Sequence, residues 1–285
     1  MATIQGGLAP LLANLAAAMG RSDLPQAVQG AAQTLLSLGL DGAALDGEAI
    51  EAALSKSGIF LERSLASGEP VQGDLKHALI SLRDALRSAL PQGARVPALS
   101  SSLPPPHRSA LPVGEPPSLP SIALLDGEAA GLKLLAETDG ALARTTLLQL
   151  ASLPDSAQSN TTQRLVVDIP IATPQGHAVV QLQIETEDEH RDGPGEERSP
   201  SWRINLAIDI EPLGPVRARI AQIDGRTHVN LYAEREVAAR ALRDDLPALQ
   251  TQLSQAALEP GDLHCRTGVP QCEPARPGLF VDRAS

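Results

Sequence analysis

Aromatic side chains are almost missing from this sequence of 285 residues, which contains one tryptophan, one tyrosine and two phenylalanines. Aromatic residues normally supply the largest buried areas of a hydrophobic core. Apolar residues still make up 42% of the chain, so a core of leucine, isoleucine, valine and alanine can form. We therefore expect a folded protein of modest stability, with about two domains on length alone.

Cysteine is scarce as well, since only Cys265 and Cys272 are present. Two cysteines cannot build a disulfide framework, and these two lack the closely spaced partners of a zinc site. We expect both to be free thiols in a reducing compartment.

Cationic residues and long apolar runs are also in short supply. Lysine and arginine number 23 against 34 acidic residues, which gives a net charge of −11 and argues against binding to nucleic acid or anionic membranes. No apolar stretch reaches the length of a membrane span. The first basic residue, Arg21, comes too late for the charged start of a secretory signal. We expect a cytoplasmic chain, with export by another route left open.

Sequence motifs of catalysis are missing too. The six histidines are scattered along the chain, and no zinc-protease, P-loop, nucleophile-elbow or dinucleotide-binding pattern occurs. We predict that the protein is not an enzyme and takes no cofactor, metal or small-molecule substrate.

Residues 1–90 have helical periodicity. Asp46 and Asp74 are placed to cap helices. Behind the second cap lies a leucine stripe at helical spacing, formed by Leu75, Leu79, Leu82, Leu86 and Leu90. The simplest interpretation is a helical hairpin with a leucine core.

Residues 91–120 are rich in proline, which is typical of an extended, semi-rigid linker without a packing surface. Helical spacing returns in residues 121–158. Beyond them, residues 159–268 predict an α+β domain, and residues 269–285 a tail.

The predicted α+β domain begins with a hairpin, because apolar residues alternate on both sides of the turn at 173–176. Three further strands are expected after it, and the first of them should bury Trp202, Ile204, Leu206 and Ile208. A helix carrying Leu242, Leu249 and Leu253 would cover that face before a closing strand. Pro247 leaves two alternatives, a second helix capped by Asp244 or Asp245 or a single kinked helix.

The string WRINLAIDIEPLGPVRARIAQIDGRTHVNLYAEREVAARALRDDLPALQTQLSQAALEPGDL resembles the C-terminal domain of flagellar hook-length control proteins. The similarity lies in the tryptophan-led strand, the segment Glu211–Val216, the strand ending Leu231-Tyr232-Ala233-Glu234, and the leucine helix. The strings SGIFLE and ALARTTLLQLASLP are similar to shorter segments of the same family.

The resemblance implies a regulator that is exported through the flagellar type III apparatus during hook assembly. It implies that the C-terminal domain contacts an export-gate membrane protein and switches export from hook-type to filament-type substrates, with hook and hook-cap proteins as further partners. The contact residues carried over from the resemblance are Pro212, Leu213, Gly214, Pro215, Val216, Leu249 and Leu253.

Other interpretations of the same residues stay open. Pro212, Leu213, Gly214 and Pro215 could serve only to set turn geometry. The chain could measure hook length or only switch export. The alternative function is a non-catalytic cytoplasmic binding module, or adaptor, that uses the same C-terminal fold.

Overall fold

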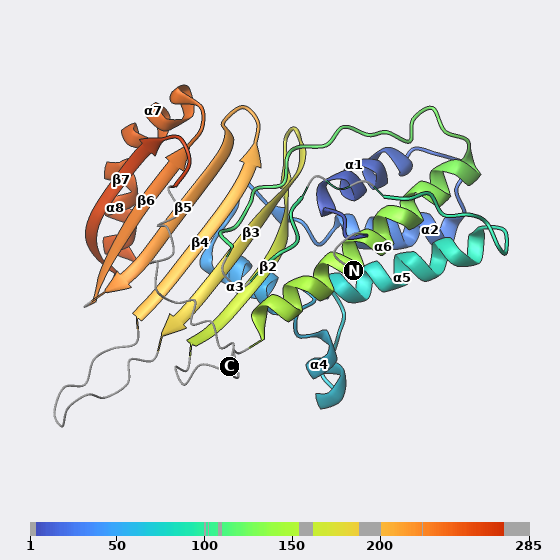
Figure 1. The fold of residues 1–285 in the computed structure, drawn as a ribbon, viewed down its shortest axis with the longest axis horizontal. Coiled ribbons are helices and arrows are strands. Elements are labelled where there is room, and N and C mark those ends of the chain that lie inside the picture. Colours follow the sequence, from blue (N-terminus) through green and yellow to red (C-terminus); the bar gives the residue numbers. More distant parts are fainter. Residues whose placement is uncertain are drawn as a thin grey trace, which may run out of the picture.

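The computed structural model describes residues 4–99, 101, 103–107, 110–153, 162–187, 201–223 and 225–270 (Figure 1). Its helices are α1 (Leu8–Ala18), α2 (Gln26–Leu36), α3 (Gly47–Ser55), α4 (Leu61–Ser67), α5 (Leu75–Ala89), α6 (Gly127–Ser152), α7 (Glu236–Asp244) and α8 (Leu246–Gln255). Its strands are β1 (Leu40–Asp41), β2 (Thr162–Thr173), β3 (Gly176–Glu187), β4 (Ser201–Ile210), β5 (Gly214–Ile223), β6 (Arg226–Ala233) and β7 (Glu259–Thr267). The predicted class, a helical N-terminal region followed by an α+β unit, is confirmed.

The strands form one sheet in chain order, β1 to β7. Strands β2 to β6 are an antiparallel meander, with the predicted turn between Thr173 and Gly176. Both outermost pairings are parallel. The closing strand β7 must run parallel to β6 because the crossover through α7 and α8 returns the chain to the same end of the sheet.

The N-terminal helices begin where carboxylates can accept hydrogen bonds from free backbone N–H groups. Asp46 accepts from Ala49 N at 2.8 Å and Asp74 accepts from His77 N at 2.9 Å, so both predicted caps are confirmed. The leucine stripe of α5 is buried along most of its length, and Leu79 and Leu82 are fully inaccessible.

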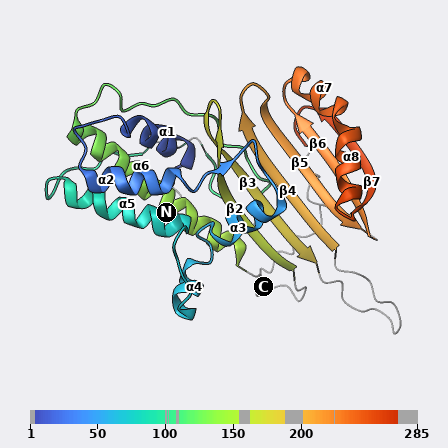
Figure 2. The same ribbon diagram turned by 180° about the vertical axis from the view of Figure 1, so that it is seen from behind.

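The leucine core extends from these helices to the sheet. Side chains of α1, α2, α5 and α6 form one buried cluster that also includes Val179 of β3. Helices α1, α2, α5 and α6 therefore lie at the β2–β3 end of the sheet, and α7 and α8 lie at the opposite end (Figures 1 and 2).

The proline-rich segment 91–120 differs from the expected spacer. Its described residues form neither helix nor strand, yet they pack against the rest of the protein. Leu103 is buried, its carbonyl accepts from Gln5 Nε2 at 2.6 Å, and Val113 N donates to Gln181 Oε1 at 2.9 Å. The expectation of a segment without a packing surface is wrong, because proline removes ladder donors but leaves carbonyls and apolar rings free to pack.

The leucine-rich segment near the C-terminus forms two helices, α7 and α8. This is the first of the two predicted alternatives, and the single kinked helix is not observed. Asp245 lies between α7 and α8, and Pro247 occupies the first turn of α8. The Asp245 side chain makes no capping hydrogen bond there. Proline is tolerated at that position because the first N–H groups of a helix have no intrahelical partner.

The buried face of β4 differs from the prediction. Trp202 is 43% exposed, and Ile204, Leu206 and Ile208 are only half-buried, whereas Asn205 and Ala207 are buried. The proline-rich segment crosses the Asn205 side of this strand, because Val113 N donates to Gln181, which pairs with Ala207 on that face. A Cβ at Gly114 would lie 2.8 Å from the Ile208 carbonyl carbon. On the other side, α7 and α8 are short, and the buried cluster that α7 forms includes Ile208 but neither Ile204 nor Leu206.

Candidate partner-binding surface

The segment Glu211–Gly214 links β4 to β5 in a tight turn. Ile210 pairs with Gly214 at its base, the Glu211–Pro212 peptide bond is cis, and Gly214 has φ +72°. That left-handed conformation strains any residue that carries a Cβ. The expected role of the turn residues in setting the local geometry is therefore visible in the backbone.

A single arginine holds this turn in place. Arg235, the residue before α7, donates from Nη1 to Glu211 Oε2 at 2.6 Å and from Nη2 to Glu211 Oε1 at 2.7 Å. Its Nη1 also donates to the Pro212 carbonyl at 2.8 Å. Such a bidentate arginine–carboxylate pair fixes direction as well as distance. The hydrogen bond from Arg235 lowers the pKa of Glu211 below its ordinary value.

Gly214 is also required because a larger side chain would collide with Arg235. A Cβ at this position would lie 2.5 Å from Arg235 Nε. Sequence reasoning missed Arg235 because it lies 24 residues from Glu211, and no local pattern marks it. Only the pairing of β5 with β6 brings the start of α7 beside the turn.

A small apolar cluster lies beneath the turn. Its buried members are Val216, Ala233, Ala238 and Ala239, and its half-buried members are Ile208, Leu213, Leu242 and Cys265. Val216 is 9% exposed, so its side chain supports the turn from below. Pro212 is exposed and Leu213 is half-buried, which leaves these two predicted contact residues accessible at the surface.

The other two predicted contact residues lie apart from the turn. Leu249 and Leu253 are half-buried on α8, which packs against β7. The turn instead neighbours α7, at the other end of the helix pair (Figures 1 and 2). The structure therefore brings five of the seven residues together and places Leu249 and Leu253 on a separate part of the same end of the sheet.

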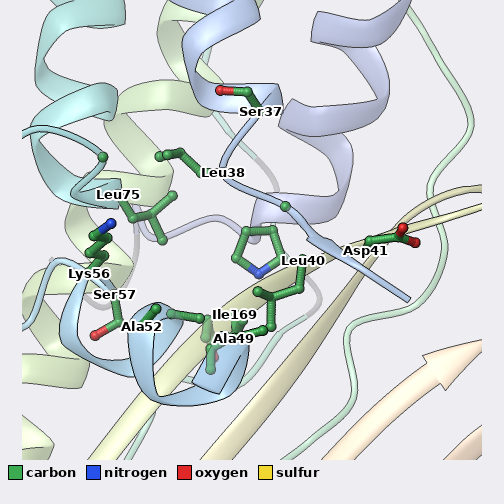
Figure 3. A pocket seen from close by; sticks show the side chains of 15 residues that line it. Ser37, Leu38, Leu40, Asp41, Ala49, Ala52, Lys56, Ser57, Leu75 and Ile169 are labelled. Carbon is green, nitrogen blue, oxygen red and sulfur yellow. The ribbon is translucent and has the colours of Figure 1, made fainter. Parts of the chain in front are cut away.

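The protein also has a pocket away from the turn. A pocket of about 300 Å³ opens between α3, the α2–β1 connection and β2 (Figure 3). Leu38, Leu40, Ala49, Ala52 and Ile169 line it, with Lys56 at one side. The described residues contain no group of histidine, cysteine and acidic side chains that could hold a metal ion.

Cys265 is a free thiol in the structure. Its Sγ donates to the Ala239 carbonyl at 3.4 Å, and burial raises its pKa. Cys272 and the predicted tail beyond residue 270 lie outside the described residues. In the part of the chain that the structure describes, no helix has both the length and the apolar character needed to cross a bilayer.

The candidate surface is thus a turn between two strands of the sheet that is held by an arginine. Loops that a scaffold positions in this way often carry binding residues. Among known protein families, the one described as "Flagellar hook-length control protein FliK" matches residues 194–273. These residues carry the flagellar hook-length control domain, which confirms the resemblance found in the sequence. The match spans the turn, α7 and α8.

Comparison with curated proteins and with solved structures found no match.

Proposed function

We propose that this protein controls flagellar hook length by switching the type III export apparatus from hook-type to filament-type substrates. The switch works through protein–protein contact between the C-terminal α+β unit and the export gate, without catalysis. The observation that carries this proposal is the family match over residues 194–273, which coincides with the clamped turn at Glu211–Gly214.

The turn and its surroundings are the proposed contact surface for the export gate. Pro212 is exposed at its tip, and the Arg235–Glu211 pair keeps the tip in one conformation. Pre-organised loops lose little conformational entropy on binding. Leu249 and Leu253 on α8 form a second contact area, and hook and hook-cap proteins are further partners during assembly.

The composition of the core supports export as an unfolded chain. The cluster beneath the turn buries only Val216 and three alanines, and small side chains contribute little burial energy. A unit held by such a cluster unfolds at modest cost, as passage through a narrow export channel requires.

The experiment compares two glycines that share a left-handed backbone. Gly214→Val places a branched side chain against Arg235, whereas Gly225 has φ +78° and no neighbouring atom within 4 Å of the position that a Cβ would take. Gly225→Val therefore reproduces the backbone strain, on the order of 1–3 kcal/mol, without disturbing the clamp. Each variant replaces the chromosomal copy, and hooks and filaments are measured by electron microscopy.

We expect overlong hooks without filaments for Gly214→Val and normal flagella for Gly225→Val, while circular dichroism shows both proteins folded. Normal flagella in a folded Gly214→Val strain would remove the turn from the mechanism. Normal filaments after deletion of residues 201–285 would reject the switch function itself and favour the alternative of a cytoplasmic binding module.

A further inference from the structure

Among the residues that the structure describes, no helix lies on one face of the sheet at its C-terminal end. Helices α7 and α8 cover the side of β6 and β7 that carries Ala233 and Cys265. Side chains alternate between the two faces of a strand, so the neighbouring residues point the other way. Figure 2 shows α8 in front of β7, and Figure 1 shows β5 and β6 from the side without a helix.

This surface lies beside the part of β4 that the proline-rich segment crosses. It is rich in arginine, and we call it the arginine face. Strand register places Arg217, Tyr232 and Arg266 in one row across β5, β6 and β7. The next row contains Arg219, Asn230 and His264. Together these six residues define the arginine face.

The arginine face contrasts with the charge of the whole chain. The protein carries a net charge of −11, yet none of the six side chains in the two rows is acidic. Of its three arginines, Arg217 pairs with Glu234 at 3.3 Å. Within the described residues, the side chains of Arg219 and Arg266 make no hydrogen bond or ion pair, so two guanidinium groups remain available.

The spacing of the two rows indicates the shape of a ligand. The available residues Arg219 and Arg266 lie in neighbouring rows, which are about 6.6–6.8 Å apart along the strands. Carboxylates two residues apart on an extended peptide have the same separation. Arginine presents a planar fork that binds a carboxylate through two parallel hydrogen bonds, and Tyr232 adds a flat apolar surface between two arginines.

We propose that the arginine face binds an extended acidic segment of a partner protein, with aspartate or glutamate at alternate positions. This surface is distinct from the clamped turn, and the proposal does not depend on the hook-length control function. Nucleic acid is the weaker candidate, because tight binding to it requires many phosphate contacts and the net charge of −11 repels a long polyanion.

The test measures binding of the full-length protein to a fluorescent peptide that alternates glutamate and threonine, by fluorescence anisotropy at low and physiological salt. The test variant is Arg219→Glu with Arg266→Glu. The control variant is Arg87→Glu with Arg240→Glu, which changes the net charge equally at two exposed positions outside the arginine face. Circular dichroism verifies that both variants fold.

We expect the test variant to weaken peptide binding at least tenfold and the control variant to change it less than twofold. A peptide alternating glutamine and threonine should not bind. Equal losses of peptide affinity in the two variants would show that binding depends only on the net charge, which would overturn the proposal. So would tighter binding of single-stranded DNA than of the acidic peptide, or stronger peptide binding after removal of residues 188–200, which would identify that acidic stretch as the occupant.

Discussion

The two ends of this molecule are stabilised to different degrees. At the N-terminal end, leucines from four helices form a continuous core in which Leu11, Leu35 and Leu79 are fully inaccessible. At the C-terminal end, the buried cluster consists of one valine and three alanines. Buried apolar area sets most of the stabilising free energy. The matched family domain therefore lies at the end with the smaller buried core.

A buried polar network joins the N-terminal helical region to the sheet. Arg144 of α6 donates from Nε to Asp168 of β2 at 2.5 Å and from Nη1 to Gln5 at 3.0 Å. Gln181 of β3 donates to the same carboxylate at 3.0 Å. Both members of the ion pair have side chains only 4% exposed. Helix and sheet therefore share a buried charge pair that neither could tolerate alone.

The largest effect is expected from breaking this pair. Arg144→Ala leaves Asp168 buried without its cation and should lower the free energy of unfolding by about 3–5 kcal/mol. Urea denaturation followed by circular dichroism measures the change. The double variant Arg144→Met with Asp168→Leu removes both charges, and it should recover most of the loss. If the single variant were as stable as the parent, the network would not hold the N-terminal helical region on the sheet.

The next largest effect is expected from Leu79 in the N-terminal core, compared with Leu206 on β4. Leu79→Ala opens a cavity in the N-terminal core and should cost about 2–5 kcal/mol. Leu206→Ala removes a half-buried side chain at the middle of the sheet and should cost less than half as much, since part of its surface already contacts water. Thermal unfolding of both variants gives the ranking, and an equal or reversed ranking would contradict the comparison of the two cores.

A smaller, pH-dependent effect is expected from Glu115 in the proline-rich segment. Its Oε2 accepts hydrogen bonds from Leu8 N and Ala9 N at the start of α1. Burial, followed by the nearby charge of Asp168, raises the pKa of Glu115 to about 7. The fit is close, because a Cβ at Gly7 would lie 1.2 Å from Glu115 Oε1.

The raised pKa gives the direction of the pH dependence. The folded protein holds the proton up to about pH 7, whereas the unfolded chain releases it near the ordinary value of about 4.3. Protonated Glu115 therefore adds on the order of 1–3 kcal/mol to the free energy of unfolding. This contribution is complete below the pKa of the unfolded chain and is lost as the pH rises through 7. Stability curves from pH 4 to 8 should flatten in Glu115→Gln, and an unchanged slope would show that Glu115 does not titrate in this window.

The smallest effect is expected at the surface of the C-terminal end. Arg226 and Glu259 form an ion pair at 3.1 Å with both side chains 62% exposed. Exposed pairs contribute about 0–1 kcal/mol because water and salt screen them. Arg226→Gln should change the unfolding free energy by less than about 0.5 kcal/mol in chemical denaturation. A loss near that of Leu79→Ala would mean that surface charge stabilises this end instead of its small core.

Local patterns in the sequence determined much of the secondary structure. Asp46 and Asp74 cap helices in the structure as predicted, because a cap depends only on a side chain and an N–H group a few residues away. Alternation located the β2–β3 hairpin and the strands after it, and Pro247 marked the start of α8. The string around Glu211–Val216 also led to the correct family domain.

Only the tertiary structure decided which face of each strand is buried and where the proline-rich segment lies. Alternation makes the two faces of β4 distinguishable, but what covers each face depends on segments far away in the chain, such as Gly114 near Ile208. The same holds for the Arg235–Glu211 clamp and the Arg144–Asp168 pair, which join positions 24 residues apart in each case. Periodicity carries information over a few residues, whereas burial and charge pairing arise from contacts that exist only after the chain has folded.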